Sequence, residues 1–261
     1  NEKPKAEAAS YDKYKGDKNH AFWYFDKEMA DATEKYYANE RGKTEQYIGF
    51  EQKGKLITFN PKSHVRMSPS FQPEADGVTF HLKAVYTDTL RNEYSKEHST
   101  HPIRMSRICG PVEVVNDTTF TVRFYRMGLD NPKRTGGICL MASVKQDHKY
   151  RSAVQQVEIR IPYRNKEGIP QRIIFPKLSD VKASVKEISL NGTADSGLPV
   201  YYYVKEGPAE IKGDKLVLTK IPPRAKFPVK VTVVAWQYGR SGEPKVQTAE
   251  AVEQSFYITA R

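Results

Sequence analysis

The sequence predicts an all-β fold made of two successive sandwiches, a jelly-roll-like β-sandwich followed by a smaller one. Three features of the 261 residues indicate this class. Short runs of alternating apolar and polar residues recur along the chain. Each run ends at a cluster of Gly, Pro, Asn or Asp, which are turn residues. No long stretch of helical periodicity separates the runs, which argues against parallel strands joined by helices.

The first set of predicted strands occupies the N-terminal two thirds of the chain. Val78–Tyr86 and Thr119–Met127 alternate, so one face of each strand is expected to be buried and the other polar. Gln46–Phe50 and Lys55–Phe59 flank a Gly-containing turn and are expected to form a hairpin. The remaining strands of this set are expected at Arg104–Cys109, Val112–Val115, Ile138–Val144, Val154–Ile161 and Gln171–Phe175.

A second set of strands follows in the C-terminal third. Val200–Val204 is apolar, aromatic and β-branched, and Gly207-Pro208 breaks it. Val229–Trp236 and Ser255–Thr259 supply the closing strands. Because sandwiches of this size bury large rings between their sheets, Trp236 is expected in the core rather than at a ligand site.

The residue pattern of Ser196–Thr219 resembles that of a known protein family. The pattern SGLPV-x-Y-x-V-x-x-GPA-x-I-x-G-x-x-L-x-LT places turn and strand residues in the order found in bacterial Ig-like repeats. These repeats belong to secreted and cell-surface proteins. The resemblance implies an Ig-like domain that serves as a spacer or adhesion module, and it brings no catalytic residues with it.

The chain is accordingly divided into three parts. Residues 1–16 are expected to be a frayed lead-in, residues 17–178 the first sandwich and residues 179–261 the Ig-like domain. Pro176–Val185 is the predicted linker. The chain is long enough for two domains with cores of their own. Its 16 Tyr and 11 Phe set it apart from disordered chains, which are poor in aromatic residues.

The net charge of +11 falls mostly in the first 178 residues. Residues 179–261 hold 12 Lys and Arg against 9 Asp and Glu, which leaves +8 for the rest of the chain. Such an excess is ordinary for a solvated surface, and it would also suit an anionic partner such as an acidic polysaccharide. A nucleic-acid partner is disfavoured, because the basic residues are interspersed with acidic ones and form no stripe.

The two cysteines, Cys109 and Cys139, each lie in an apolar, strand-like run. Buried thiols and a cross-strand disulfide both remain open, because a bridge requires Cα atoms within about 7 Å of each other. A secreted protein permits the disulfide. Neither cysteine is accompanied by the His and Asn or Asp pattern of a thiol enzyme.

No recognised catalytic motif is present. The sequence contains no GxSxG, no GxGxxG before a helix, no P-loop, no HExxH and no CxxC. The acid pairs Asp26/Glu28 and Glu74/Asp76 could serve a glycosidase, which needs two carboxyl groups about 5–9 Å apart. Acids two residues apart are also common on turns, so no catalytic residue is predicted and an enzyme is the less favoured class.

No metal ligand is predicted. His98 and His101 have a spacing that could hold a metal, but two histidines in one long charged loop are better explained by chance. Asp76, Asp130 and Asn131 offer oxygen ligands, so a structural calcium ion is the one cofactor that the sequence leaves open.

The polar faces of the predicted strands supply the candidate binding residues. If the strands are neighbours in one sheet, their outward side chains form a cationic face with an aromatic ring, which could stack on a pyranose and bind its hydroxyl or carboxylate groups. Any sheet with one solvent-exposed face produces the same alternation. The predicted ligand-binding residues are Trp23, Tyr24, His81, Lys83, Arg123, Tyr125, Glu158 and Arg160.

A second resemblance suggests a function. The runs YIGF, DGVTFHLKAVY, ICGPVEVVNDTTFTVRFYRMG and AVQQVEIRIPYRNKEG, followed by an Ig-like module, resemble accessory β-sandwich modules of secreted polysaccharide-degrading proteins from Bacteroidetes. The resemblance implies a non-catalytic, extracytoplasmic module that binds a polysaccharide, acidic glycans included, and works beside a parent enzyme. The alternatives are a glycan-active hydrolase or lyase domain and a purely structural spacer. No apolar run is long enough to span a membrane.

Overall fold

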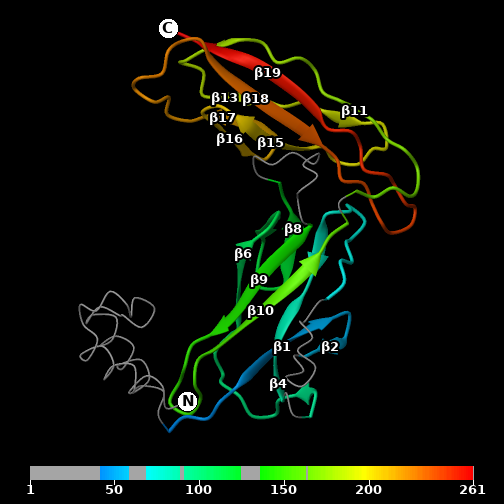
Figure 1. The fold of residues 1–261 in the computed structure, drawn as a ribbon, viewed down its shortest axis with the longest axis vertical. Coiled ribbons are helices and arrows are strands. Elements are labelled where there is room, and N and C mark those ends of the chain that lie inside the picture. The colour runs from blue at the N-terminus through cyan, green and yellow to red at the C-terminus, as the bar shows by residue number, and fades with distance from the viewer. Residues whose placement is uncertain (1–41, 59–68, 89–90, 125–135, 163, 261) are drawn as a thin grey trace, which may run out of the picture.

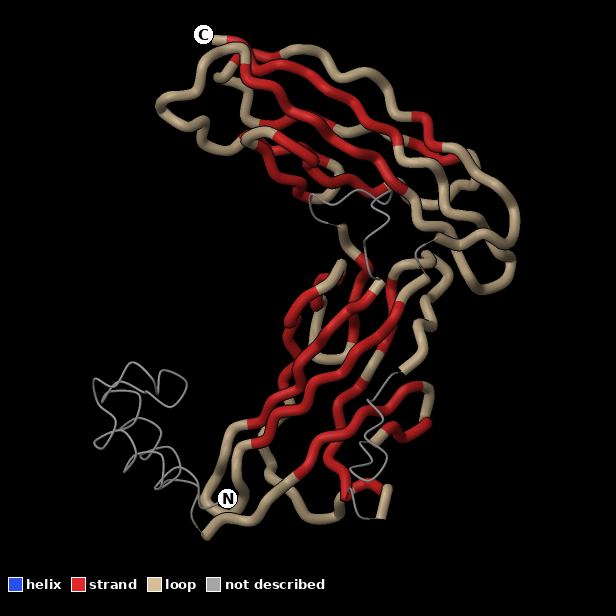
Figure 2. Tube along the Cα trace, in the orientation of Figure 1, coloured by secondary structure: helices blue, strands red, loops and turns tan. Residues whose placement is uncertain are grey.

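The computed structural model describes residues 42–58, 69–88, 91–124, 136–162 and 164–260. These residues form strands, turns and loops, and the described part of the chain contains no helix. Two β-sandwiches are joined end to end, and the second is tilted across the end of the first (Figures 1 and 2). The predicted all-β fold with two successive sandwiches is confirmed.

Among the described residues, the first sandwich contains ten strands in three hydrogen-bonded groups, with the orders β2-β1-β4-β5, β3-β8-β7 and β10-β9-β6. β3 and β4 are separated only by Leu82, so the first two groups form one layer and the third group forms the other. The strands are β1 (Tyr47–Gln52), β2 (Lys55–Ile57), β3 (Thr79–His81), β4 (Lys83–Asp88), β5 (Glu93–Tyr94), β6 (Arg104–Cys109), β7 (Val112–Val114), β8 (Thr119–Val122), β9 (Gly137–Val144) and β10 (Ala153–Arg160).

This strand order is that of an Ig-type sandwich. An Ig domain pairs its strands as ABED in one sheet and CFG in the other. Here β1, β3/β4, β8 and β7 occupy the first arrangement, and β6, β9 and β10 occupy the second. The jelly-roll-like arrangement expected for this sandwich is therefore refined to an Ig-type one.

The core of the first sandwich follows the predicted alternation from Val78 to Lys83, whereas Val85, which was expected on the outward face, is buried. Val78, Phe80 and Leu82 point inward and are at most 1% exposed, while His81 and Lys83 lie on the exposed face. The facing layer contributes apolar side chains of β9 and β10 at every second position, since successive strand residues point to opposite faces.

The second sandwich contains the strand orders β12-β19-β18-β15, β13-β17-β16 and β11-β14. β12 pairs parallel to β19, and the other pairs are antiparallel. These strands are β11 (Ile173–Ile174), β12 (Val181–Lys182), β13 (Glu187–Ser189), β14 (Thr193–Ala194), β15 (Tyr201–Glu206), β16 (Ala209–Lys212), β17 (Lys215–Leu218), β18 (Val229–Trp236) and β19 (Val252–Thr259).

The chain enters the second sandwich earlier than the predicted boundary between residues 178 and 179. β11 pairs with β14, and Ile173, Phe175 and Leu178 belong to the second hydrophobic core. The expected linker Pro176–Val185 also packs against this core through Val181. The prediction missed this because a two-residue strand carries almost no periodicity.

The two sandwiches share a cluster of aromatic side chains, which we call the aromatic junction: Phe71, Phe124, Tyr201, Trp236 and Tyr238. The Trp236 ring meets Phe124 edge to face with centroids 4.6 Å apart and stacks on Tyr201 at 5.1 Å. Trp236 and Tyr238 are each 1% exposed and are continuous with the core of the first sandwich. The prediction that Trp236 is a core residue is confirmed.

Hydrogen bonds from side chains to backbone carbonyls also stabilise the region around the aromatic junction. Arg240 Nη1 donates to the carbonyl of Ala75 at 3.3 Å, and the Tyr238 hydroxyl donates to the carbonyl of Pro162. Burial in this region, with a smaller contribution from the Asp76 charge, raises the pKa of Tyr201 to about 12. Phe124 of the first sandwich packs against Trp236 of the second, so the two sandwiches are in direct contact at this junction.

The turn between β9 and β10 is expected to make the stability of the protein depend on pH. Backbone N–H groups of Tyr150 and Lys149 donate to Asp147 Oδ1 at 2.7 and 2.8 Å, and the bond from Tyr150 is the main cause that lowers the pKa of Asp147 to about 2. A lowered folded-state pKa contributes stability above the unfolded value near 4, and that contribution is lost as the pH falls toward 2.

We therefore expect the Tm difference between the wild type and Asp147→Asn to shrink as the pH falls from 5 to 2. Thermal unfolding across this range measures the difference directly. A difference that stays constant with pH would show that the charge of Asp147 plays no part.

Candidate functional site

The predicted binding face is divided between two layers. The expectation required the strands that carry His81, Arg123 and Glu158 to be neighbours in one sheet. Instead β10 pairs with β9 in the opposite layer from β3, β4 and β8. Glu158 and Arg160 lie together on β10 and form an ion pair of 3.1 Å. The prediction of a single continuous binding face is therefore wrong, because the alternation of residues along one strand does not indicate which strands are adjacent.

Three of the predicted binding residues, Trp23, Tyr24 and Tyr125, lie outside the described residues. The remaining predicted residues fall into two cavities and one isolated pair, the pair being Glu158 and Arg160.

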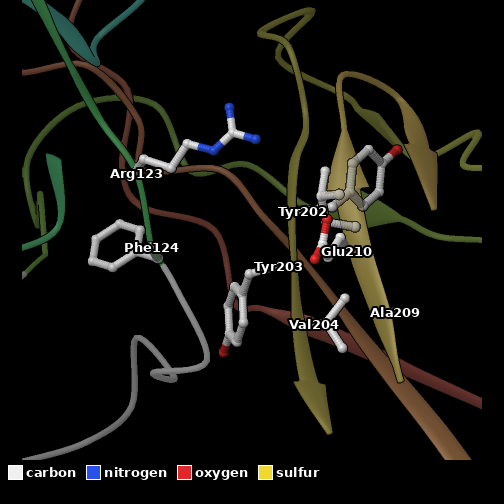
Figure 3. A pocket seen from close by; sticks show the side chains of 8 residues that line it. Arg123, Phe124, Tyr202, Tyr203, Val204, Ala209 and Glu210 are labelled. Carbon is white, nitrogen blue, oxygen red and sulfur yellow. The ribbon is translucent and has the colours of Figure 1, made fainter. Parts of the chain in front are cut away.

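Arg123 lines a cleft between the two sandwiches, which we call the interdomain cleft (Figure 3). It has a volume of about 460 Å³. Arg123 follows β8, and its Nη1 lies 3.0 Å from Glu113 Oε2. The lining residues are Arg123, Phe124, Tyr202, Tyr203, Val204, Ala209, Glu210 and Ile211.

The aromatic rings of the interdomain cleft are unsuited to stacking on a sugar. Phe124 is 2% exposed and Tyr203 3% exposed, because both belong to the cores of the sandwiches. Tyr202 is 7% exposed, and its hydroxyl accepts a hydrogen bond from Gly192 N at 2.6 Å. A platform for a pyranose needs an open ring face, so this cleft offers mainly the Arg123 guanidinium and the Glu210 carboxylate.

His81 and Lys83 are brought together in a second cavity of about 570 Å³, which we call the polar pocket. The β1–β2 hairpin, the segment before β3, and the adjoining ends of β3 and β4 form its walls. The lining residues are Glu51, Gln52, Lys53, Gly54, Gln72, Pro73, Glu74, His81, Leu82, Lys83 and Thr118.

Ionisable side chains line one side of the polar pocket. His81 Nε2 lies 2.5 Å from Glu74 Oε1, and both side chains are about half exposed, at 54% and 53%. Lys83 is the cross-strand partner of Glu51, and Glu51 Oε2 accepts a hydrogen bond of 2.5 Å from the Tyr94 hydroxyl. Each of these groups keeps further donor or acceptor capacity for a ligand.

Amide groups form the other side. Gln52 is 7% exposed, and its Nε2 donates to the carbonyl of Ser70 at 2.8 Å. Gln72 Nε2 donates to Ser70 Oγ at 2.6 Å. These hydrogen bonds orient the two glutamines beside the ionisable side chains of the pocket. The pocket thus combines planar amides, carboxylates, an imidazole and ammonium groups within one small volume.

Sequence reasoning found His81 and Lys83 but missed Glu51, Gln52 and Gln72. The alternation of Val78–Tyr86 marked the first two as outward-facing. The others lie at the end of a hairpin strand and in a loop with three prolines, and no periodic signal distinguishes them from other surface polar residues. The β1–β4 pairing brings Glu51 beside Lys83.

The acid pairs do not converge. Glu74 is held by His81, whereas Asp76 accepts hydrogen bonds from the backbone N–H groups of Val78 and Thr79 at 3.0 and 2.8 Å. Asp76 is therefore occupied in shaping the turn before β3. The pair Asp26/Glu28 lies outside the described residues.

One of the two histidines considered as metal ligands has other partners. His98 stacks on Tyr86 with ring centroids 4.1 Å apart, and its Nδ1 lies 2.7 Å from the carbonyl of Ser99. Within the described ranges, no group of three or more His, Cys, Asp or Glu side chains is arranged to hold a metal ion. Asp130 and Asn131, which the calcium hypothesis requires, lie outside those ranges. The described residues also include no helix with the length and hydropathy to cross a membrane.

Comparison with known proteins leaves the family open. No protein-family model and no curated protein matches the chain. The solved structures that share some likeness include extracellular cadherin domains. The chain is similar to Drosophila N-cadherin EC1-4 (12% identity, TM-score 0.27), covering 83% of this chain and 50% of that one.

Human protocadherin-24 EC1-2 is similar at 13% identity and a TM-score of 0.28, with 74% of this chain and 94% of that one covered. Mouse cadherin-23 EC22-24 is similar at 16% identity and a TM-score of 0.25, with 83% and 65% covered. The chain spans about half the length of the N-cadherin structure. At these scores the likenesses carry no argument, so the Ig-type description rests on the strand order alone.

Proposed function

We propose that this chain is a non-catalytic polysaccharide-binding module and that the polar pocket is its binding site. The observation that carries the proposal is the composition of that pocket: two amides, two carboxylates, an imidazole and two ammonium groups line one open cavity. Sugar hydroxyl groups both donate and accept hydrogen bonds, and this mixed set supplies both kinds of partner.

The charge balance of the polar pocket favours a neutral, hydroxyl-rich glycan over an acidic one. Lys53 and Lys83 are matched by Glu51 and Glu74. The overall charge of +11 is thus not concentrated at this site. A uronate would be repelled by the two carboxylates, whereas Arg123 in the interdomain cleft remains the best-placed guanidinium for one.

The proposal places the module outside the cytoplasm, as an accessory part of a secreted bacterial glycan-degrading system. Two β-sandwiches packed through the aromatic junction would hold the polar pocket at a fixed distance from the chain before β1 and after β19. This supports a presenting role, and it is equally what a structural spacer would need.

A glycan-active enzyme is the second candidate, because Glu51 and Glu74 line the same pocket. A general acid that works at neutral pH needs a carboxyl group in a desolvated site. The Glu74 side chain is instead 53% exposed and paired with His81. Binding without turnover is therefore the better-supported function.

Calorimetric titration of the full chain tests the proposal. Neutral glycans (β-glucan and xylan oligosaccharides) and a uronate polymer (polygalacturonate) are titrated at low and high salt. We expect saturable binding of a neutral glycan that is insensitive to salt. The double variant His81→Ala/Lys83→Ala should weaken it at least about tenfold, since a lost hydrogen bond to the Lys83 ammonium alone is worth about 1.5–3 kcal/mol.

The matched control is His101→Ala/Lys182→Ala, which removes the same residue types from exposed positions outside the polar pocket and should bind normally. Salt-sensitive binding of polygalacturonate alone, unaffected by the pocket variant, would contradict the pocket assignment. Release of shorter oligosaccharides in the same tubes would favour the enzyme. A complete absence of binding would favour the spacer.

A further inference from the structure

Cys109 and Cys139 are direct cross-strand partners in the β6–β9 pair. The pairing shifts register at Ile108, and this irregularity brings Cys109 opposite Cys139. Directly opposed residues in an antiparallel pair have Cα atoms about 4.5 or 5.5 Å apart and point to the same face. Both separations lie within the range that a disulfide spans. The structure carries both residues as free thiols.

The two thiols differ in accessibility. Cys109 is exposed and ends the edge strand β6, where Arg107 and Ile108 are exposed as well. Cys139 is half-buried on the central strand β9. Burial and the neighbouring Cys109 thiol raise the pKa of Cys139, and Glu158, its partner on β10, acts in the same direction. Cys109 is thus the thiol that a reagent in solution meets first.

We infer that Cys109 and Cys139 form a reversible dithiol–disulfide site that reacts with low-molecular-weight disulfides. In the first step the Cys109 thiolate attacks one sulfur of the small disulfide, which releases one thiolate and leaves a mixed disulfide on Cys109. In the second step the Cys139 thiolate attacks the Cys109 sulfur and displaces the second small thiolate. Two protein thiols are oxidised, one small disulfide is reduced to two thiols, and the protons pass to solvent or to those thiols.

A Cys109–Cys139 disulfide would link the edge strand β6 covalently to the central strand β9 of the same layer. Within the described residues, β6 pairs with β9 alone. A bridge between them closes a loop that contains β7, β8 and Arg123 of the interdomain cleft. Because cross-linking reduces the freedom of the unfolded chain, the oxidised form should be the more stable one. This inference does not depend on the polar pocket or on glycan binding.

The test is incubation of the folded full chain with oxidised glutathione, followed by alkylation of remaining thiols and intact mass analysis. We expect the wild type to lose the mass of two hydrogens and both alkylation sites, and to gain roughly 5–10 °C in Tm, reversed by dithiothreitol. Cys139→Ser should instead accumulate one glutathione on Cys109, because the resolving thiol is absent. Cys109→Ser should react far more slowly.

Three results would overturn the inference. These are two alkylatable thiols after prolonged incubation of the wild type, stable glutathione adducts on both cysteines, and disulfide-linked dimers as the only oxidised product. The measurements on the wild type do not depend on how the variants fold.

Discussion

Replacing Trp236 with alanine is expected to lower the free energy of unfolding by about 3–5 kcal/mol. Trp236 is 1% exposed, and its ring contacts Phe124 of the first sandwich edge to face and stacks on Tyr201 of the second. Removing the ring leaves a cavity in a core that both sandwiches share. Urea unfolding followed by circular dichroism should show the loss in one transition that includes both sandwiches.

Two further variants test whether the loss of stability comes from the buried ring of Trp236. The indole N–H of Trp236 finds no hydrogen-bond acceptor among the described residues, so Trp236→Phe loses volume but no hydrogen bond and should cost clearly less than the alanine change. Tyr257→Ala, at a ring that is 43% exposed on β19, should cost no more than about 0.5 kcal/mol. A Trp236→Ala cost below about 1 kcal/mol would contradict a shared core.

Gly77→Ala is expected to cost about 2–5 kcal/mol, because two penalties act at one position. Gly77 has a φ of +77°, where side chains other than hydrogen are strained. An added Cβ would also lie 2.0 Å from the carbonyl oxygen of Gly239 in the second sandwich. The backbones must move apart, which loosens the aromatic junction. Thermal and urea unfolding measure the cost.

Gly213→Ala is the control for backbone strain alone. Gly213 has a φ of +65°, and nothing lies within 4 Å of the position that an alanine Cβ would occupy there. Its alanine variant should cost about 1–2 kcal/mol. Equal costs for the two variants would show that the close approach of Gly77 to Gly239 contributes nothing to stability.

The burial of individual strands could be predicted from the sequence. The alternation in Val78–Tyr86 correctly separated Phe80 and Leu82 from His81 and Lys83, because side chains of a strand alternate between faces. The closing strands of the second sandwich and the burial of Trp236 were also confirmed. These features depend on local pattern, which is fully present in the sequence.

The arrangement of strands could not be predicted in the same way. Placing Arg160 relative to His81 required knowledge of which strands pair, and pairing depends on contacts between residues far apart in the chain. The polar pocket depends on the same long-range pairing, since Glu51 meets Lys83 only through the β1–β4 register. Cys109 lies opposite Cys139 because the strand register shifts at Ile108, and no local sequence pattern predicts this shift.

The most direct measurement of the proposed function is a nuclear magnetic resonance titration of the isotope-labelled full chain with neutral β-glucan and xylan oligosaccharides. We expect the perturbed backbone amides to cluster at Gln52–Gly54, Gln72 and His81–Lys83, around the polar pocket. Perturbations centred on Arg123 or on β10, or none at saturating oligosaccharide, would contradict the assignment of the polar pocket as a glycan site.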